Sequence, residues 1–259
     1  MRKVYSFLLA VGCAVFVVSS AMAESSELRS SAFEGFYGQV GTGYEQNRFS
    51  SLSHSWVNTT TNFKGRGAAD GQKASGMPLS MGVGYFHRLH EAYLLGVGVD
   101  YAPLVQQTAK FDTASTNDNN ISFRIHDASY KTSHRVNAYL MPAYAFDADK
   151  LGYVKIGYSV QSLQHAQPGR LDETHVDKGY STAKVIHGYV VGVGYKQIMT
   201  RGIYGFVEGN YTAYGKQTLH GTGFLPSDGP IALSASNLGV SAYNVLVGLG
   251  YTFSSPGGS

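Results

Sequence analysis

Large apolar residues recur at every second position in eight separate stretches of the chain. Residues 93–101, YLLGVGVDY, alternate between a bulky face of Tyr, Leu and Val and a small face of Gly and Asp. The same alternation occupies residues 36–44, 79–86, 136–146, 153–160, 188–195, 203–212 and 243–253. Period-two alternation is typical of a β-strand whose two faces meet different surroundings. The pattern therefore predicts eight strands.

The connections between these stretches alternate in length. Three are short, at 87–92, 147–150 and 196–202. Four are long, at roughly 46–78, 102–135, 164–183 and 215–240, and they are rich in Asn, Ser, Thr, Gly, Gln and His, which predicts loops. Up-and-down strands bring alternate connections to the same end, so the short turns share one end of the molecule and the long connections share the other.

The composition of the two faces indicates which one lies inside. A soluble barrel would bury the bulky face and carry charges outside. Here the other face is mostly Gly, Ser, Asn and Thr, which suits a narrow interior, and tyrosines bracket the apolar residues at 93 and 101 and at 189 and 195, as at membrane interfaces. We predict an all-β, eight-stranded antiparallel up-and-down transmembrane β-barrel with the loop asymmetry of bacterial outer-membrane proteins. A secreted soluble sandwich is the alternative.

The amino terminus has the layout of a secretory signal peptide. Arg2 and Lys3 precede an apolar run, and Ala21-Met22-Ala23 offers a small-residue cleavage site. We expect a signal peptide at 1–23 cleaved near Ala23, a barrel at 24–253 and a short tail at 254–259. A lipoprotein anchored at Cys13 is the alternative. No later run reaches the roughly 18 apolar residues that a spanning helix needs.

Composition narrows the possible partners. Loss of the signal peptide removes Arg2 and Lys3 and lowers the formal net charge from +3 to +1, which argues against nucleic acid as a partner. The single cysteine, Cys13, lies in the signal peptide, so we expect no disulfide framework and no cysteine metal site. We predict no cofactor. The 32 Gly and 19 Tyr fit strands with one small face and amphipathic rings at their ends.

Several segments resemble those of small eight-stranded outer-membrane barrels, including opacity-type surface antigens and the membrane domain of OmpA-like proteins. The resemblance rests on GFYGQVGTGY (35–44), MGVGYFHRL (81–89), YLMPAYAF (139–146), GVGYKQ (192–197), YGFVEGNY (204–211) and VGLGYTF (247–253). It implies location in a Gram-negative outer membrane, contact with its lipid and lipopolysaccharide, and insertion by the barrel-assembly machinery. The assembly signal would be Tyr243, Val245, Val247, Leu249, Tyr251 and Phe253.

A few charged residues fall on the inward face. Lys155 and Glu208 lie at similar distances from the short-turn end and are expected to pair across the lumen. Glu45, Asp100 and Arg135 are expected to form a second group near the outer mouth. The groups either neutralise one another in a polar plug, since unpaired buried charges are costly, or gate a narrow channel for small solutes or ions.

No motif indicates catalysis. The nine histidines are scattered over predicted loops, turns and strand ends, and their spacing indicates neither a triad nor a metal site. We predict that the protein is not an enzyme. A lipid A-modifying enzyme is an alternative, because its His and Ser could be far apart in sequence.

The first long connection offers interaction residues. It holds the only tryptophan, Trp56, and an excess of cations from Arg48, Lys64, Arg66 and Lys73. Trp and Arg often anchor interfaces when exposed, so this connection could bind host surface ligands; alternatively, its cations neutralise the bacterium's own lipopolysaccharide. The favoured function is a surface antigen or adhesin that acts through extracellular loops. The narrow channel is the second hypothesis.

Overall fold

Thirteen β-strands form the described part of the chain, residues 31–120, 122–170, 176–225 and 229–253 of a computed structural model. The predicted signal peptide and tail lie outside these residues. A 3₁₀ turn (η2, Ser31–Phe33) precedes β1 (Gly35–Phe49), β2 (Leu52–Asn58), β3 (Lys64–Ala69), β4 (Gln72–Gly76), β5 (Leu79–His90), β6 (Tyr93–Ala102), β7 (Gln106–Gln107), β8 (Phe111–Asn117), β9 (Ser122–Asp147), β10 (Lys150–Arg170), β11 (Val176–Thr200), β12 (Ile203–Leu225) and β13 (Gly229–Phe253). No helix in this part of the chain is long and apolar enough to cross a membrane.

Eight of the strands close into an antiparallel ring. The order around the ring is β1, β5, β6, β9, β10, β11, β12 and β13, and β13 pairs with β1 to complete it. The closing ladder runs from Phe36 opposite Phe253 to Phe49 opposite Val240. All eight alternating stretches of the sequence lie in these strands, which confirms the predicted eight-stranded barrel.

The bulky face of each ring strand points outward, as predicted. Val83, Val97, Leu140, Ile156 and Val247 are exposed on the outer wall. Exposed tyrosines lie among them at the wall's edges. This outer surface would be costly in water and suits lipid, because a bilayer core accepts apolar groups and the rings favour its interfaces.

The inward face holds more aromatic side chains than the sequence suggested. Near the short turns, Tyr37, Phe86, Tyr139, Tyr153 and Tyr204 are buried with Phe33 of η2 in one apolar cluster. Glycines on the same face make room for the rings: a Cβ at Gly98 would lie 2.6 Å from the Tyr37 hydroxyl and 2.7 Å from the Tyr139 ring. The small face is therefore small because it receives aromatic rings from neighbouring strands, such as Tyr139 of the paired strand β9.

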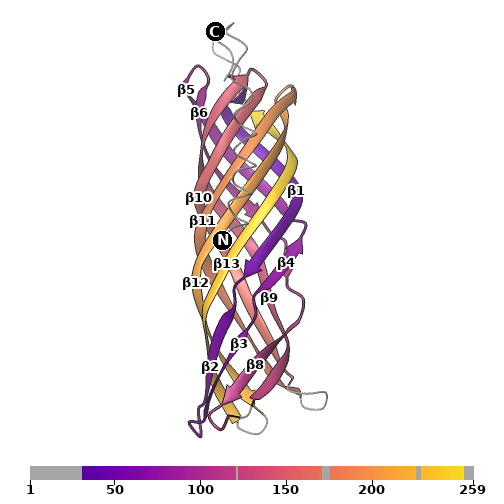
Figure 1. Cartoon of the computed structure of the whole chain (residues 1–259). Coiled ribbons are helices and arrows are strands. Elements are labelled where there is room, and N and C mark those ends of the chain that lie inside the picture. The colour runs from indigo at the N-terminus through magenta and orange to yellow at the C-terminus, as the bar shows by residue number, and fades with distance from the viewer. Residues whose placement is uncertain (1–30, 121, 171–175, 226–228, 254–259) are drawn as a thin grey trace, which may run out of the picture.

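The wall continues beyond the ring at the end opposite the short turns (Figure 1). Here the sequence predicted loops, and the structure differs, because most of 46–78, 102–135, 164–183 and 215–240 is strand. β2 pairs with the outer part of β13, β3 with β2, β8 with β3, and the outer part of β9 with β8. We call these segments, with the outer parts of β10, β11 and β12, the outer extension.

Bulges separate the ring from the outer extension. His134 and Asn237 have positive φ angles of 51° and 64°, beside register shifts in the β9–β10 and β12–β13 ladders. Each inserts one extra residue, so the inward face changes phase. In β13, the even-numbered residues Ala242 and Val240 are buried on the ring side of the bulge. On the side of the outer extension, the odd-numbered residues Ala235 and Leu233 are buried instead.

Candidate functional site: a charged belt across the lumen

A belt of polar side chains crosses the lumen at the outer side of the aromatic cluster. Each residue comes from the inward face of a ring strand, and each is at most 8% exposed. The belt consists of Glu45 on β1, Asp100 on β6, Arg135 and Asn137 on β9, Lys155 on β10, Glu208 and Asn210 on β12, and Asn244 on β13.

Lys155 is the centre of the belt. Its Nζ lies 2.7 Å from Asp100 Oδ2 and 2.9 Å from Glu208 Oε1, and 4.0 Å from the centroid of the Tyr139 ring. The structure thus brings Lys155 and Glu208 together as predicted, but from the two strands that flank β11 rather than from opposite sides of the lumen. It also places Asp100 against Lys155, rather than with the predicted outer-mouth group.

Neutral donors complete the coordination of both carboxylates. Asn137 Nδ2 donates to Asp100 Oδ1 at 2.6 Å. Tyr153 Oη donates to Glu208 Oε2 at 2.7 Å, and Asn210 Nδ2 donates to Glu208 Oε1 at 2.8 Å. Charge-assisted bonds of this length are strong, so the arrangement fixes the positions of four strands, β6, β9, β10 and β12, relative to one another.

Glu45 and Arg135 form the second ion pair. Arg135 Nη2 lies 2.6 Å from Glu45 Oε2, and both side chains are 4% exposed. Asn47 Nδ2 donates to Glu45 Oε1 at 3.1 Å. Asn244 connects the two pairs, because its Nδ2 donates to Glu45 Oε2 at 3.4 Å and its Oδ1 accepts from Asn210 at 2.9 Å.

Lys196 is a buried cation that the sequence analysis missed. Its Nζ lies 3.8 Å from the Tyr37 ring centroid and 4.6 Å from that of Tyr204, and donates to Tyr204 Oη at 3.2 Å. The residue lay within a predicted turn, but β11 continues to Thr200. The period-two pattern could have identified Lys196 as an inward residue, because it continues the alternation of the inward residues Gly192 and Gly194.

The predicted interaction residues of the first long connection divide into two groups. Arg48, Lys64, Arg66 and Lys73 are exposed. Trp56 is only 2% exposed, which contradicts its expected role as a surface anchor. Its ring packs with Phe63, and its Nε1 donates to Ser115 Oγ at 2.9 Å. Trp56 lies on the inward face of β2, in a strand where a loop was expected.

The residues of the predicted assembly signal all lie in β13. Tyr243, Val245, Val247, Leu249, Tyr251 and Phe253 are on the strand's outward face, and all except Tyr243 are exposed. β13 is the strand that closes the ring against β1. Recognition of this face by the assembly machinery stays a prediction.

Two histidines are buried in the outer extension. Burial lowers the pKa of His54 below its usual value. Burial also lowers the pKa of His165 to about 4, and the positive charge of His54 acts in the same direction. The His165 ring packs 4.9 Å from that of Tyr130. Within the described ranges, no group of three or more His, Cys, Asp or Glu residues could hold a metal ion.

Comparisons with known proteins identify the fold. No protein-family model and no curated protein sequence matches the chain. Among solved structures, the outer membrane protease OmpT of Escherichia coli matches with a TM-score of 0.50 and 12% identity over 88% of this chain and 100% of that one. The outer membrane protein OprG of Pseudomonas aeruginosa matches with a TM-score of 0.49 and 12% identity over 86% and 97%. Likeness at this identity concerns fold alone, and with the ring described above it establishes an antiparallel, eight-stranded transmembrane β-barrel, the fold of these outer-membrane proteins.

Proposed function

We propose that the protein is a non-enzymatic surface protein, whose outer extension binds polyanionic ligands outside the cell. The observation that carries this proposal is the arrangement of Lys64 and Arg66 on β3. Both are exposed, and neither forms an ion pair within the described residues. They lie on a strand that is paired on both sides, with β2 and β8.

Trp56 fixes the direction of these two cations. Gly65 lies between them and pairs directly with Trp56, whose indole occupies the space where a Cβ of Gly65 would lie. Because neighbouring residues of a strand point to opposite faces, Lys64 and Arg66 both point outward. Arg124 on β9 is exposed nearby, since its partner Ala114 also pairs with β3. Because β3 is paired on both sides, its backbone is already ordered, and binding to these cations costs little backbone entropy.

The charged belt supports a binding role over catalysis or conduction. Its acids and cations contact one another and are almost inaccessible to solvent. The aromatic cluster fills the lumen on one side of it. The exposed wall of the outer extension is therefore the surface that is best able to meet a partner.

Binding of dextran sulphate, with uncharged dextran as the matched polymer, tests the proposal. We expect the refolded protein to bind only the sulphated polymer, and Lys64→Ser/Arg66→Ser to weaken binding at least tenfold. Arg88→Ser/Lys150→Ser removes the same charge near the short turns, where both side chains are also partly exposed, and should bind like the wild type. Equal binding by the Lys64/Arg66 variant would contradict the proposal.

A further inference from the structure

Two cations lie directly opposite each other on the outer wall, nearer the short-turn end of the barrel than the cations of β3 are. Arg48 on β1 and Lys73 on β4 are register partners, and both are exposed. Like charges at directly opposed positions destabilise a strand pair. No acidic side chain within the described residues forms an ion pair with either one. Both positive charges are therefore without an acidic counter-charge among the described protein residues.

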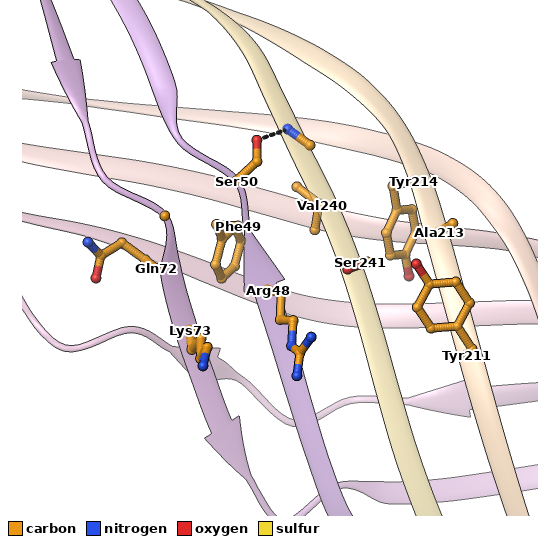
Figure 2. A pocket seen from close by; sticks show the side chains of 12 residues that line it. Arg48, Phe49, Ser50, Gln72, Lys73, Tyr211, Ala213, Tyr214, Val240 and Ser241 are labelled. Carbon is orange, nitrogen blue, oxygen red and sulfur yellow. Dashed lines mark hydrogen bonds between the residues drawn. The ribbon is translucent and has the colours of Figure 1, made fainter. Parts of the chain in front are cut away.

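The two cations adjoin an open hollow. It has a volume of about 490 Å³, and its lining includes Arg48, Lys73, Tyr211 and Ser241. Figure 2 shows Arg48 and Lys73 on neighbouring strands, with Ser241 and Tyr211 on the next two strands across the hollow. The guanidinium of Arg48 lies 5.1 Å from the Tyr243 ring centroid, and its Nε donates to Gln46 Oε1 at 3.2 Å.

The position of the hollow relative to the membrane identifies its ligand class. Tyr44 is on the same face of β1 as Arg48, four residues or about 13 Å nearer the membrane. Its ring lies 6.3 Å from that of Tyr243, which pairs with Tyr211. Tyrosines of this kind mark the membrane interface. Beyond them toward the short turns, Val245 and Val247 are exposed on the wall. A ligand here meets cations, then aromatic rings, then apolar surface.

We propose that Arg48 and Lys73 bind the phosphate of a phosphorylated glycolipid of the outer leaflet. The phosphate neutralises both cations, and Arg48 can donate two hydrogen bonds to it. The sugar lies against Tyr243 and Tyr211, and the acyl chains follow the apolar wall toward the short turns. This proposal does not rest on polyanion binding by Lys64 and Arg66, which lie on another strand, in the outer extension.

Lipid retention by the refolded protein tests the proposal. Proteoliposomes are doped with bisphosphorylated lipid A or with the same lipid after enzymatic removal of its phosphates, and the lipid that co-purifies after detergent extraction is measured. We expect the wild type to retain the phosphorylated form at least tenfold better. Arg48→Gln/Lys73→Gln should lose this preference, whereas the matched control Lys64→Gln/Arg66→Gln should keep it. The heat-dependent gel mobility of each variant verifies folding.

Four results would overturn the proposal. One is retention of phosphorylated lipid by the Arg48/Lys73 variant at the wild-type level. Another is equal retention of both lipids by the wild type. The third is displacement of the lipid by millimolar inorganic phosphate, which would indicate a site for free anions rather than for lipid. Loss of preference in the Lys64/Arg66 control alone would locate the site in the outer extension and would likewise contradict it.

Discussion

Lys155 holds two buried carboxylates that have no other ion-pair partner within the described residues. Replacing it with Met would leave Asp100 and Glu208 buried without a counter-charge, which typically lowers stability by about 3–5 kcal/mol. We expect Lys155→Met to lower the urea midpoint, measured by gel mobility, whereas Lys150→Met at the partly exposed start of β10 should not. Adding Asp100→Asn to Lys155→Met should recover part of the loss, because it removes one uncompensated charge; a further fall would contradict the assigned pairing.

His165 makes the outer extension sensitive to acid. Its pKa is lowered to about 4 in the folded protein, against about 6.5 for an unperturbed histidine. The unfolded segment therefore binds a proton first, so stability is full above pH 6.5 and decreases as the pH falls toward 4, by on the order of 3 kcal/mol. The protection factors of β10 amides, which correct for the slower intrinsic exchange in acid, should fall across this window, and His165→Phe should remove most of that fall. Equal protection factors at pH 7 and pH 4 would show that His165 does not titrate in this way.

At the scale of elements, bulges decide how far the sequence could be followed. In the ring the period-two pattern is uninterrupted, and all eight strands could be predicted. In the outer extension the phase changes at His134 and Asn237, and β2 places Leu, His, Trp and Asn on its inward face. An inward face of mixed polarity, together with an interrupted period-two pattern, is typical of a loop. Trp56 was therefore expected to be exposed. The pairing of Lys155 with Glu208 could be predicted from their inward positions and similar depth. The partner of Asp100 could not, because it depended on how far the Lys155 side chain reaches over the intervening strand β9.

The bulge at Asn237 gives a test at the same scale. Its φ of 64° is adopted readily by Asn or Gly but not by a β-branched residue. Asn237→Gly should be nearly neutral, whereas Asn237→Val should destabilise the outer extension by about 1–2 kcal/mol. Leu233, four residues before Asn237, pairs with Trp56, which is the only tryptophan. The fluorescence emission of Trp56 in urea therefore reports the loss of stability. Ser236→Val is the control, and equal loss in both valine variants would mean that the backbone conformation is not the cause.

At the scale of the whole molecule, the described part of the barrel buries equal numbers of acidic and basic side chains. The buried acids of the described chain are Glu45, Asp100 and Glu208, and the buried Lys and Arg residues are Arg135, Lys155 and Lys196. Two of the cations pair with the acids, and the third is held by aromatic rings. An eight-stranded barrel has an interior that side chains just fill. The fold thus combines an interior filled by side chains with exposed cations on its outer wall.

This closure predicts that the protein does not conduct ions. In planar bilayers the wild type should be silent, and Lys155→Ala should be silent too, because the aromatic cluster next to the belt still fills the lumen. Conductance should require loss of both the charged belt and the aromatic cluster, as in Lys155→Ala combined with Tyr37→Ala and Phe86→Ala. Tyr37→Ala/Phe86→Ala alone keeps the ion pairs and is the control, expected to conduct far less. If the wild type opened steadily and Lys155→Ala changed its conductance, the narrow channel would replace the surface protein as the better account, because the belt would then act as a gate rather than a seal.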